Sequence, residues 1–388
     1  MIVKLESITE RITDYVASGS FASLKENVKI YKTPNYAILV KTADFANNFK
    51  KDLTYTDKQG YDYLKNSNLF GGELILSNIG SIGKVFIVPK LDMPMTLASN
   101  SIMVKPDKNH LAKWLYYYFL SNYGHEQLLS ITSGTSMPKF NKTSLKALEI
   151  KDKSLEEQLN QVKSLDCILS VIAKERVELS LLDELIKSRF NEMFSKIIYS
   201  GDRETNFGSI CDGIIGLTYK PDNISDEGTI VLRSGNIQNN NLQIIDDVVR
   251  VSNINIPDEK MVRDLDILMC ARNGSARLVG KTCIIRNPTE QMTFGAFMTI
   301  IRTKYPYILH HYMNSDFFRI QLKSTQTASV NQITNGMLKE YSVFSPTDAE
   351  EKQFRSFVEQ IDKLKFNVQK RIDYYQELLN KKMDEYFN

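Results

Sequence analysis

Several features that identify common protein classes are scarce or missing in this sequence of 388 residues. No run approaches 18 apolar residues, and the opening stretch MIVKLESITERITDYV has no apolar centre of the signal-peptide type, so we expect neither a membrane span nor an export signal. The four cysteines form no Cys-x-x-Cys pair and have no histidine at ligand spacing. We therefore expect a cytoplasmic protein with reduced thiols, most of them in the core, and Cys167 on the packed face of a helix.

Sequence motifs of catalysis are missing as well. There is no GxGxxG, GxxxxGK[ST], HExxH or GxSxG pattern, and no Asn/Asp-Pro-Pro-Tyr/Phe element of the amino-methyltransferase kind. The histidines fall in or near amphipathic segments and are expected to be partly exposed helix residues rather than ligands: His110, His125, His310 and His311. We predict a chain that is not an enzyme and holds no metal or cofactor itself, with a catalytic site dispersed along the sequence as an open alternative.

Charge is modest overall but unevenly distributed. The net charge is only +3, yet residues 1–153 carry 20 Lys and Arg against 14 Asp and Glu, whereas residues 195–348 carry 16 of each. Arg11 is the only arginine before residue 154, and residues 195–348 contain nine. Because arginine makes planar bidentate contacts and lysine acts as a point charge, we expect the two halves to contact a partner differently.

Two stretches of about 40 residues carry apolar side chains at steps of three and four, the pattern of a helix with one apolar stripe. A lone helix of this length cannot bury its stripe, so we predict that the two pair as an antiparallel coiled coil about 60 Å long, at about 1.5 Å per residue. The alternative is two ordinary amphipathic helices, each packed on its own domain. The stripes are Leu155, Leu159, Val162, Leu165, Leu169, Ile172, Leu179, Leu182, Ile186, Phe190 and Met193, and then Phe354, Phe357, Ile361, Leu364, Val368, Ile372, Tyr375, Leu379, Met383 and Tyr386.

The sequence also repeats itself at a period of about 193 residues. Similar segments recur in the same order and with similar spacing, and each copy ends in one of the two long helical stretches. The clearest matches are YAILVKTADF (36–45) with GTIVLRSGNI (228–237), GGELILSNIGSIGKVFIV (71–88) with DLDILMCARNGSARLVGKTCII (264–285), and MTLASNSIMVK (95–105) with MTFGAFMTIIR (292–302).

Each copy combines short strands of Val, Ile and Leu, turns of Gly, Asn and Ser, and an amphipathic helical segment before a final polar loop. We predict an α+β fold in which two duplicated mixed α/β domains are separated by the two long antiparallel helices and related by a pseudo-two-fold axis. The expected boundaries are 1–153 for the first domain, 154–198 for the central helix, 199–348 for the second domain and 349–388 for the C-terminal helix.

The turns that recur in both copies are rich in groups that suit nucleic acid. Arginine suits guanine and Asn or Gln suits adenine in the major groove, whereas Lys, Ser and main-chain N–H groups suit phosphates. The alternative is that these are simply polar surface loops. The candidates in the first copy are Lys41, Thr42, Asn78, Ser81, Lys84, Ser136, Lys139 and Asn141. Those in the second are Arg233, Ser234, Asn236, Arg272, Asn273, Ser275, Arg277, Lys281, Ser329, Asn331 and Gln332.

This plan resembles the specificity subunit of type I restriction–modification systems. The resemblance covers nearly the whole chain and rests on the order of its pieces: two divergent domains, each followed by a long helix that opens with Glu156-Glu157-Gln158 or with Glu350-Glu351-Lys352-Gln353. The LRSGNIQNN turn (232–240), the NGSARLVGK hairpin (273–281) and the SGTSMPKFNKTSL loop (133–145) also match. The proline-rich stretch that often precedes the first helix is replaced here by residues 149–153.

The resemblance implies that each domain is a target recognition domain reading one part of a bipartite site in double-stranded DNA, and that the helices set the unread gap. It also implies docking of two adenine-N6 methyltransferase subunits and of restriction–translocation subunits, in a role in phage defence. S-adenosylmethionine, ATP and Mg²⁺ would then belong to those partner subunits and not to this chain. The runner-up function is a coiled-coil scaffold or adaptor that binds proteins, and not DNA, through its two duplicated domains.

Overall fold

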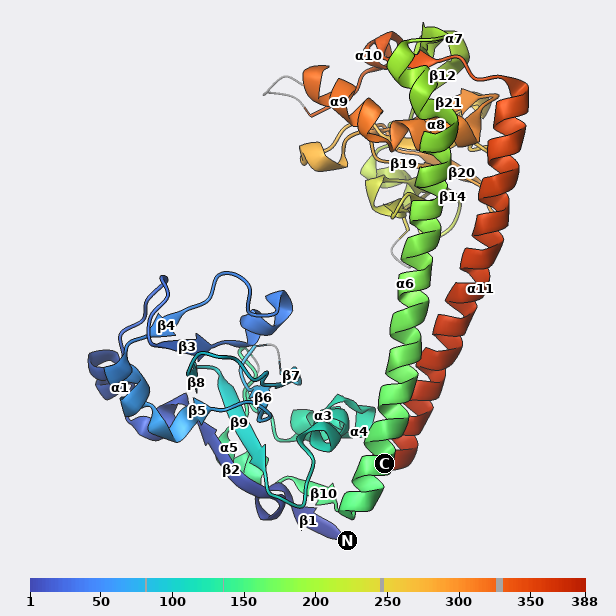
Figure 1. The fold of residues 1–388 in the computed structure, drawn as a ribbon. Helices are drawn as coiled ribbons and strands as arrows, with labels where there is room; N and C mark the ends of the chain where they lie inside the picture. Colours follow the sequence, from blue (N-terminus) through green and yellow to red (C-terminus); the bar gives the residue numbers. More distant parts are fainter. Residues whose placement is uncertain (81, 135, 245–247, 326–330) are drawn as a thin grey trace. The chain divides into compact units, whose positions relative to one another are not determined.

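The computed structural model describes residues 1–388 apart from residues 81, 135, 245–247 and 326–330. The chain divides into two compact units: unit 1 comprises residues 1–176 and 370–388, and unit 2 comprises residues 177–369. Two long helices, α6 (Leu155–Ser200) and α11 (Asp348–Phe387), each contribute one part to unit 1 and the other to unit 2 (Figure 1). Among the described residues, no helix is both long and apolar enough to cross a membrane.

Unit 1 contains two four-stranded sheets and a short strand pair. The first sheet has the antiparallel order β2-β9-β6-β7, and the second has the order β4-β3-β8-β5 with β3 and β8 parallel. The strands are β1 (Ile2–Lys4), β2 (Thr9–Asp14), β3 (Ala37–Val40), β4 (Tyr55–Thr56), β5 (Asn68–Leu69), β6 (Leu74–Ser77), β7 (Val85–Ile87), β8 (Met95–Leu97), β9 (Ser101–Pro106) and β10 (Glu149–Lys151). The shorter helices are α1 (Phe21–Asn27), α2 (Lys58–Tyr63), α3 (Ala112–Leu120), α4 (Asn122–Ser130) and α5 (Lys142–Lys146).

Unit 2 repeats this topology. The strand run β12-β21-β18-β19 corresponds to β2-β9-β6-β7, and the parallel pair β14–β20 corresponds to β3–β8. The strands are β11 (Glu204–Asn206), β12 (Cys211–Ile215), β13 (Ile224–Ser225), β14 (Thr229–Leu232), β15 (Ile237–Gln238), β16 (Asn241–Leu242), β17 (Arg250–Val251), β18 (Ile267–Cys270), β19 (Thr282–Ile284), β20 (Met292–Phe294), β21 (Met298–Thr303) and β22 (Ser342–Phe344). The shorter helices are α7 (Phe207–Ile210), α8 (Pro306–Met313), α9 (Asp316–Thr325) and α10 (Asn335–Glu340).

The predicted duplication extends to single hydrogen bonds. In unit 1 the Phe140 N–H donates to the Asn78 carbonyl oxygen at 3.2 Å, and in unit 2 the Ile333 N–H donates to the Ala271 carbonyl oxygen at 2.7 Å. Both partners are shifted by the same 193 residues. The α+β fold class is therefore confirmed, with β15 and β16 as an addition at the sheet edge of unit 2.

The long helices contact each other within each unit. In unit 1 the Tyr386 hydroxyl on α11 donates to Ser164 Oγ on α6 at 3.2 Å. In unit 2 the Phe354 ring on α11 lies 5.7 Å from the Phe190 ring on α6. The early part of each helix thus pairs with the late part of the other, so the two run antiparallel, as predicted.

The predicted stripe on α6 was only partly correct. Leu165, Ile172 and Phe190 are buried, but Leu155, Leu159 and Leu169 are at least 36% exposed. A helix pair covers only a narrow seam on each partner, and α6 carries apolar side chains on more than one face. Helix periodicity identified the helix correctly but assigned too wide a face to its contact with α11.

Two further predictions about single residues were wrong. Cys167 is exposed on α6, whereas the other three cysteines are buried as expected, and burial raises the pKa of the Cys211 and Cys283 thiols to about 12. His310 is buried rather than partly exposed: its Nδ1 lies 3.1 Å from Thr282 Oγ1. Both errors have the same cause, because one helix turn offers positions of very different burial that sequence spacing alone does not separate.

Each domain is tied to its long helix in two places. The first and last strands pair, β1 with β10 and β11 with β22. In addition, Gln158 Oε1 on α6 accepts the Leu111 N–H before α3 at 2.8 Å. At the equivalent position on α11, the Glu351 carboxylate accepts the N–H groups of Tyr307 and Ile308 in the first turn of α8, both at 3.0 Å. A neutral amide in unit 1 is thus replaced by a buried carboxyl in unit 2.

Replacing Phe354 by alanine should strongly destabilise unit 2. The Phe354 side chain is fully buried and packs on the rings of Phe190 and Phe194, so we expect a loss of about 3–5 kcal/mol in the free energy of unfolding, measured by urea denaturation. Phe366→Ala on the same helix is the control, because that ring is 59% exposed and its loss should cost about 0.5 kcal/mol or less. Equal losses in both variants would contradict the assigned packing.

Glu351→Gln should reveal an unusual pH dependence. Burial raises the pKa of Glu351, so its stabilising contribution is complete below the ordinary glutamate pKa of about 4.3 and is lost as pH rises through the higher folded value. The stability advantage of the wild type over Glu351→Gln should therefore shrink between pH 4.5 and 7 in thermal melts.

Glu350→Gln is the matched control for that measurement. The hydrogen bond from Arg203 lowers the pKa of Glu350, so the contribution of Glu350 is present above the ordinary pKa and is lost as pH falls. The advantage of the wild type over Glu350→Gln should therefore hardly change above about pH 5.5, and it should shrink as the pH falls towards and below the ordinary glutamate pKa of about 4.3. Parallel trends for the two neighbours would rule out the environments described here.

Candidate functional site

One end of the main sheet in unit 2 brings together two of the predicted polar loops: residues 271–277 after β18, the second loop, and residues 331–332 before α10, the last loop. Arg272, two residues after β18, forms an isolated antiparallel bridge with Gln332. The Asn273 N–H donates to the Asn331 carbonyl oxygen at 3.3 Å, and Asn331 Nδ2 donates to the Gly274 carbonyl oxygen at 3.1 Å. Residues more than 50 positions apart in the sequence therefore form one continuous surface.

The first loop of unit 2, residues 233–236 after β14, is part of the same surface. Asn273 Nδ2 donates to Ser234 Oγ at 3.3 Å, and the Arg233 guanidinium donates to the Tyr219 hydroxyl at 2.9 Å. Asn236 is buried, accepts the Arg233 N–H at 2.8 Å and donates to the Gln243 carbonyl oxygen at 3.0 Å. Asn236 thus shapes the turn from inside, while Arg233 and Ser234 lie at its surface. We call the site formed by residues 233–236, 271–277 and 331–332 the unit 2 loop cluster.

The other predicted residues of unit 2 lie on or beside this cluster. The Ser275 N–H donates to Asn273 Oδ1 at 2.9 Å, which closes the turn after Arg272. Arg277 is exposed on a short 3-10 turn, and Lys281 is half-buried with its carbonyl oxygen accepting the Cys270 N–H. Ser329 lies outside the described residues.

Unit 1 brings two of its three loops together in the same way. Asn78 Nδ2 donates to the Phe140 carbonyl oxygen at 3.1 Å, and Ile79 forms an isolated bridge with Lys139. Asn141 caps α5 by accepting the Ser144 N–H at 2.9 Å. The exposed residues here are Lys84, Ser136, Lys139 and Asn141, and Ser81 lies outside the described residues.

The first loop of unit 1 connects through aromatic packing instead. Asp44 is buried and accepts the Lys41 N–H at 2.8 Å, which repeats the role of Asn236. Lys41 Nζ donates to the Asp52 carbonyl oxygen at 3.3 Å, and Thr42, next to it, is half-buried. Phe45 in the same turn stacks on Phe86 of β7, with ring centroids 4.4 Å apart. The Lys41 ammonium group therefore already has one hydrogen-bond partner within its own unit.

Sequence reasoning missed one prominent residue of the unit 2 loop cluster, Phe297. It lies in the turn from β20 to β21, it is 59% exposed, and the Arg272 guanidinium lies over its ring, 5.4 Å from the centroid. The Phe297 carbonyl oxygen accepts the N–H groups of both Ala271 and Arg272 at 3.0 Å. The repeat could have identified Phe297. When MTFGAFMTIIR is aligned with MTLASNSIMVK, this aromatic residue lies opposite Asn100, a residue typical of turns.

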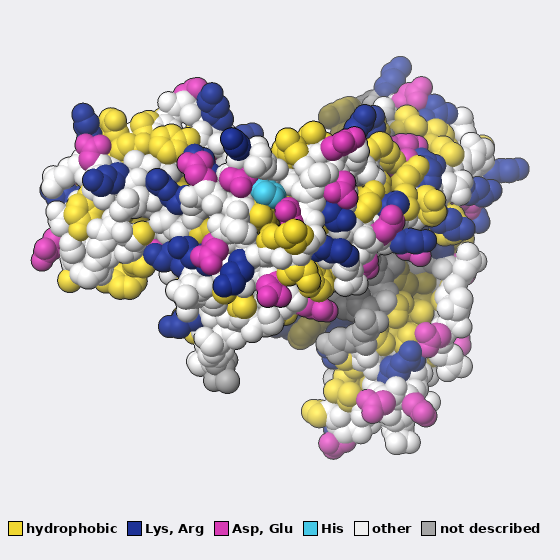
Figure 2. Space-filling view, turned by 90° about the horizontal axis from the view of Figure 1, so that it is seen from below, with side chains coloured by type: hydrophobic (Ala, Val, Ile, Leu, Met, Phe, Trp, Pro, Cys, Tyr) yellow, Lys and Arg dark blue, Asp and Glu magenta, His cyan; other side chains and the backbone are white. Residues whose placement is uncertain are grey.

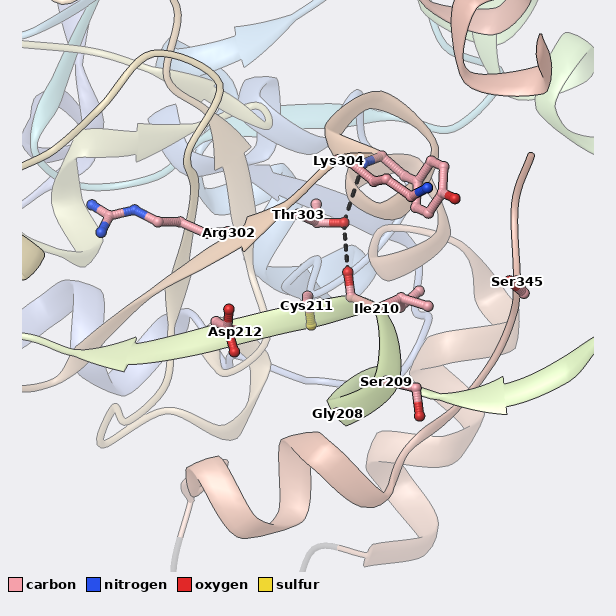
Figure 3. A pocket seen from close by; sticks show the side chains of 10 residues that line it. Gly208, Ser209, Ile210, Cys211, Asp212, Arg302, Thr303, Lys304 and Ser345 are labelled. Atoms are coloured by element: carbon pink, nitrogen blue, oxygen red, sulfur yellow. Dashed lines mark hydrogen bonds between the residues drawn. The ribbon is translucent and has the colours of Figure 1, made fainter. Parts of the chain in front are cut away.

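A hollow of about 500 Å³ lies beyond the other end of β21 (Figure 3), lined by residues that include Asp212, Arg302 and Lys304. Both cationic side chains form ion pairs: Arg302 with Asp266 at 2.9 Å and Lys304 with Asp348 at 3.2 Å. Thr303 Oγ1 donates to the Ile210 carbonyl oxygen at 2.8 Å. The hollow therefore offers no set of converging reactive groups among its described lining residues.

The described side chains show neither a cluster of metal-ligand type nor a field of one charge sign. In the part of the chain that the structure describes, no group of three or more His, Cys, Asp or Glu side chains is placed to hold a metal ion. Figure 2 shows Lys and Arg side chains interspersed with Asp and Glu over the visible face, in line with the net charge of +3. Sequence-specific contacts here would thus depend on particular side chains more than on a broad basic field.

Comparison with known proteins identifies relatives of this chain. Residues 11–180 match the family described as the type I restriction modification DNA specificity domain. A chain from a structural study of complex assembly and conformational transition of the type I R-M system has a TM-score of 0.61 at 14% identity, over 100% of this chain and 97% of that one. The type I restriction–modification system S subunit from M. genitalium has a TM-score of 0.54 at 13% identity, over 100% and 96%. No curated protein matches the chain.

Proposed function

We propose that this chain, a member of the specificity-subunit family of type I restriction–modification systems, reads a bipartite site in double-stranded DNA. Unit 1 carries the family domain, and unit 2 repeats the topology of unit 1. Each unit would act as a target recognition domain for one half-site. The chain would carry no catalysis of its own.

The observation that carries this proposal is the recurrence of one loop arrangement at the same sheet end in both units. The equivalent hydrogen bonds Phe140 to Asn78 and Ile333 to Ala271 fix the last loop against the second in each unit. Around that fixed junction the side chains at equivalent positions differ: Ile79 and Lys139 form the bridge in unit 1, and Arg272 and Gln332 form it in unit 2. A constant frame with variable polar side chains is what reading two different base sequences requires.

The partners follow from the family. A relative solved in a study of type I complex assembly supports docking of subunits on this chain, and we assign these as two adenine-N6 methyltransferase subunits together with restriction–translocation subunits. On α6 in unit 2, Val177, Leu181 and Leu185 are 45–63% exposed and recur every four residues on one face, which suits a partner helix. S-adenosylmethionine, ATP and Mg²⁺ would be held by the partner subunits.

Co-expression with a type I methyltransferase subunit that assembles with this chain tests this function. Single-molecule sequencing of the host DNA should reveal N6-methyladenine in one bipartite motif that disappears when this chain is omitted. A scaffold that binds only proteins would yield no motif and would select no sequence from a random duplex pool. Absence of any motif from an assembled, active methyltransferase complex would therefore reject DNA reading.

Alanine replacements of three arginines test which surface reads the DNA. Arg233, Arg272 and Arg277 lie on the unit 2 loop cluster, and loss of an arginine that contacts guanine should cost about 1–3 kcal/mol and relax one base position of one half-site. Lys65→Ala in unit 1, on an exposed 3-10 turn, is the control and should leave every position unchanged. If all three arginine variants retain the full motif, the loop assignment is wrong.

A further inference from the structure

Phe297 and Arg272 lie side by side at the end of two paired strands. In the register of β18 and β21, Cys270 lies opposite Met298, which places the residues just beyond these strands next to each other. The Arg272 guanidinium lies over the Phe297 ring, 5.4 Å from its centroid. The Met298 N–H also donates to the Gly295 carbonyl oxygen at 2.8 Å, which closes a tight turn with Phe297 inside it. The turn therefore fixes the backbone from which the Phe297 ring projects.

This contact distinguishes Arg272 from its two neighbours. The Arg233 guanidinium donates to the Tyr219 hydroxyl and so has part of its donor edge occupied. Arg277 is exposed, and among the described residues no ring or hydrogen-bond acceptor holds its side chain. Arg272 is held by an aromatic face, while among those same residues no acceptor takes its guanidinium N–H groups. It is thus the arginine of the cluster that is both restrained and available.

A restrained guanidinium with an open edge suits one kind of ligand. Its N–H donors lie in the plane of the group, and a cation–π contact uses the face of the group without consuming those donors. Guanine presents O6 and N7 as two adjacent acceptors in the major groove, which an arginine edge matches bidentately. Restraint before binding reduces the loss of side-chain freedom when the pair forms.

We propose that Arg272 reads a guanine in the half-site of unit 2, and that Phe297 is the positioning residue that holds the Arg272 guanidinium for this contact. The proposal rests on the proposed function and deepens it. Phe297 need not touch the DNA for this role.

Unit 1 has no such pair at the equivalent place. Ile79 occupies the position of Arg272 and bridges Lys139, and Asn100 occupies the position of Phe297. Asn100 has a positive φ of 69°, so its backbone takes a left-handed conformation that a bulky aromatic residue adopts at a cost. The Arg272–Phe297 device therefore belongs to unit 2 alone, and the half-site read by unit 1 should not respond to it.

The test uses the full chain assembled with its methyltransferase and a duplex library in which each motif position is randomised. For each variant we would compare the methylation rates of duplexes with guanine and with another base at each motif position. Arg272→Ala should lower this rate ratio by about tenfold or more at one guanine. Phe297→Ala and Phe297→Leu should weaken the preference at that same position by about two- to fivefold, since an exposed cation–π contact is of that size. Phe297→Tyr and Phe297→Trp should restore it, because both keep an aromatic face. Lys65→Ala, an exposed residue outside the unit 2 loop cluster, is the control and should leave the preference at that guanine unchanged.

The double variant separates positioning from direct contact. If Phe297 acts through Arg272, then Arg272→Ala/Phe297→Ala should be no worse than Arg272→Ala at that guanine. Additive losses, or a Phe297→Leu variant equal to wild type, would overturn the positioning role, and an unchanged motif in Arg272→Ala would overturn the guanine assignment. Since Phe297 is 59% exposed, unchanged melting of the variants is expected. These outcomes presuppose a wild-type motif; its absence would instead refute the proposed function.

Discussion

The structure depends on burial of the apolar seam between α6 and α11 inside each unit. In unit 2, Phe190 and Phe194 of α6 and Phe354 of α11 belong to the same buried cluster as Tyr307 and Ile308 of α8. The helix pair is thus part of the domain core and not an appendage. Since neither helix can bury its apolar side chains alone, unit 1 is complete only when residues 370–388 join residues 1–176, whereas unit 2 forms from the continuous stretch 177–369.

The same constraint explains why each domain is fastened to its helix by polar contacts as well. Gln158 and Glu351 occupy equivalent positions and bind the backbone where α3 and α8 begin. These groups satisfy N–H donors that a helix start leaves without an intrahelical partner. The exchange of an amide for a titratable carboxyl gives the junction in unit 2 a pH dependence that the junction in unit 1 lacks, although the topology is preserved.

A rigid frame of this kind leaves the sheet ends available for variation. The hydrogen bonds that fix the last loop against the second are made by backbone atoms, so they persist whatever the side chains are. Asp44 and Asn236 likewise hold the first turn from inside in the two units. Side chains outside this frame, such as Lys139 and Arg272, can differ without loss of the fold. Under the proposed function, recognition of two different half-sites by one duplicated architecture would require no change in the core.

The sequence by itself determined the two long helices, the duplication and the fold class. Periodicity over about 40 residues and repeated segment order are signals spread over many positions, so errors at single residues do not obscure them. Most of the candidate side chains lie in loops or short turns of the structure, where the sequence predicted turns. It also placed the polar turns of unit 2 in an order that proved to share one sheet end.

Only the tertiary structure decided which single residues are exposed and which meet. It buried Asn236 and His310, exposed Cys167 and Leu159, and set Phe297 against Arg272 across two strands. The reason is physical: burial and contact between distant residues depend on strand register and on the narrow width of a helix–helix seam, and neither is written in local spacing.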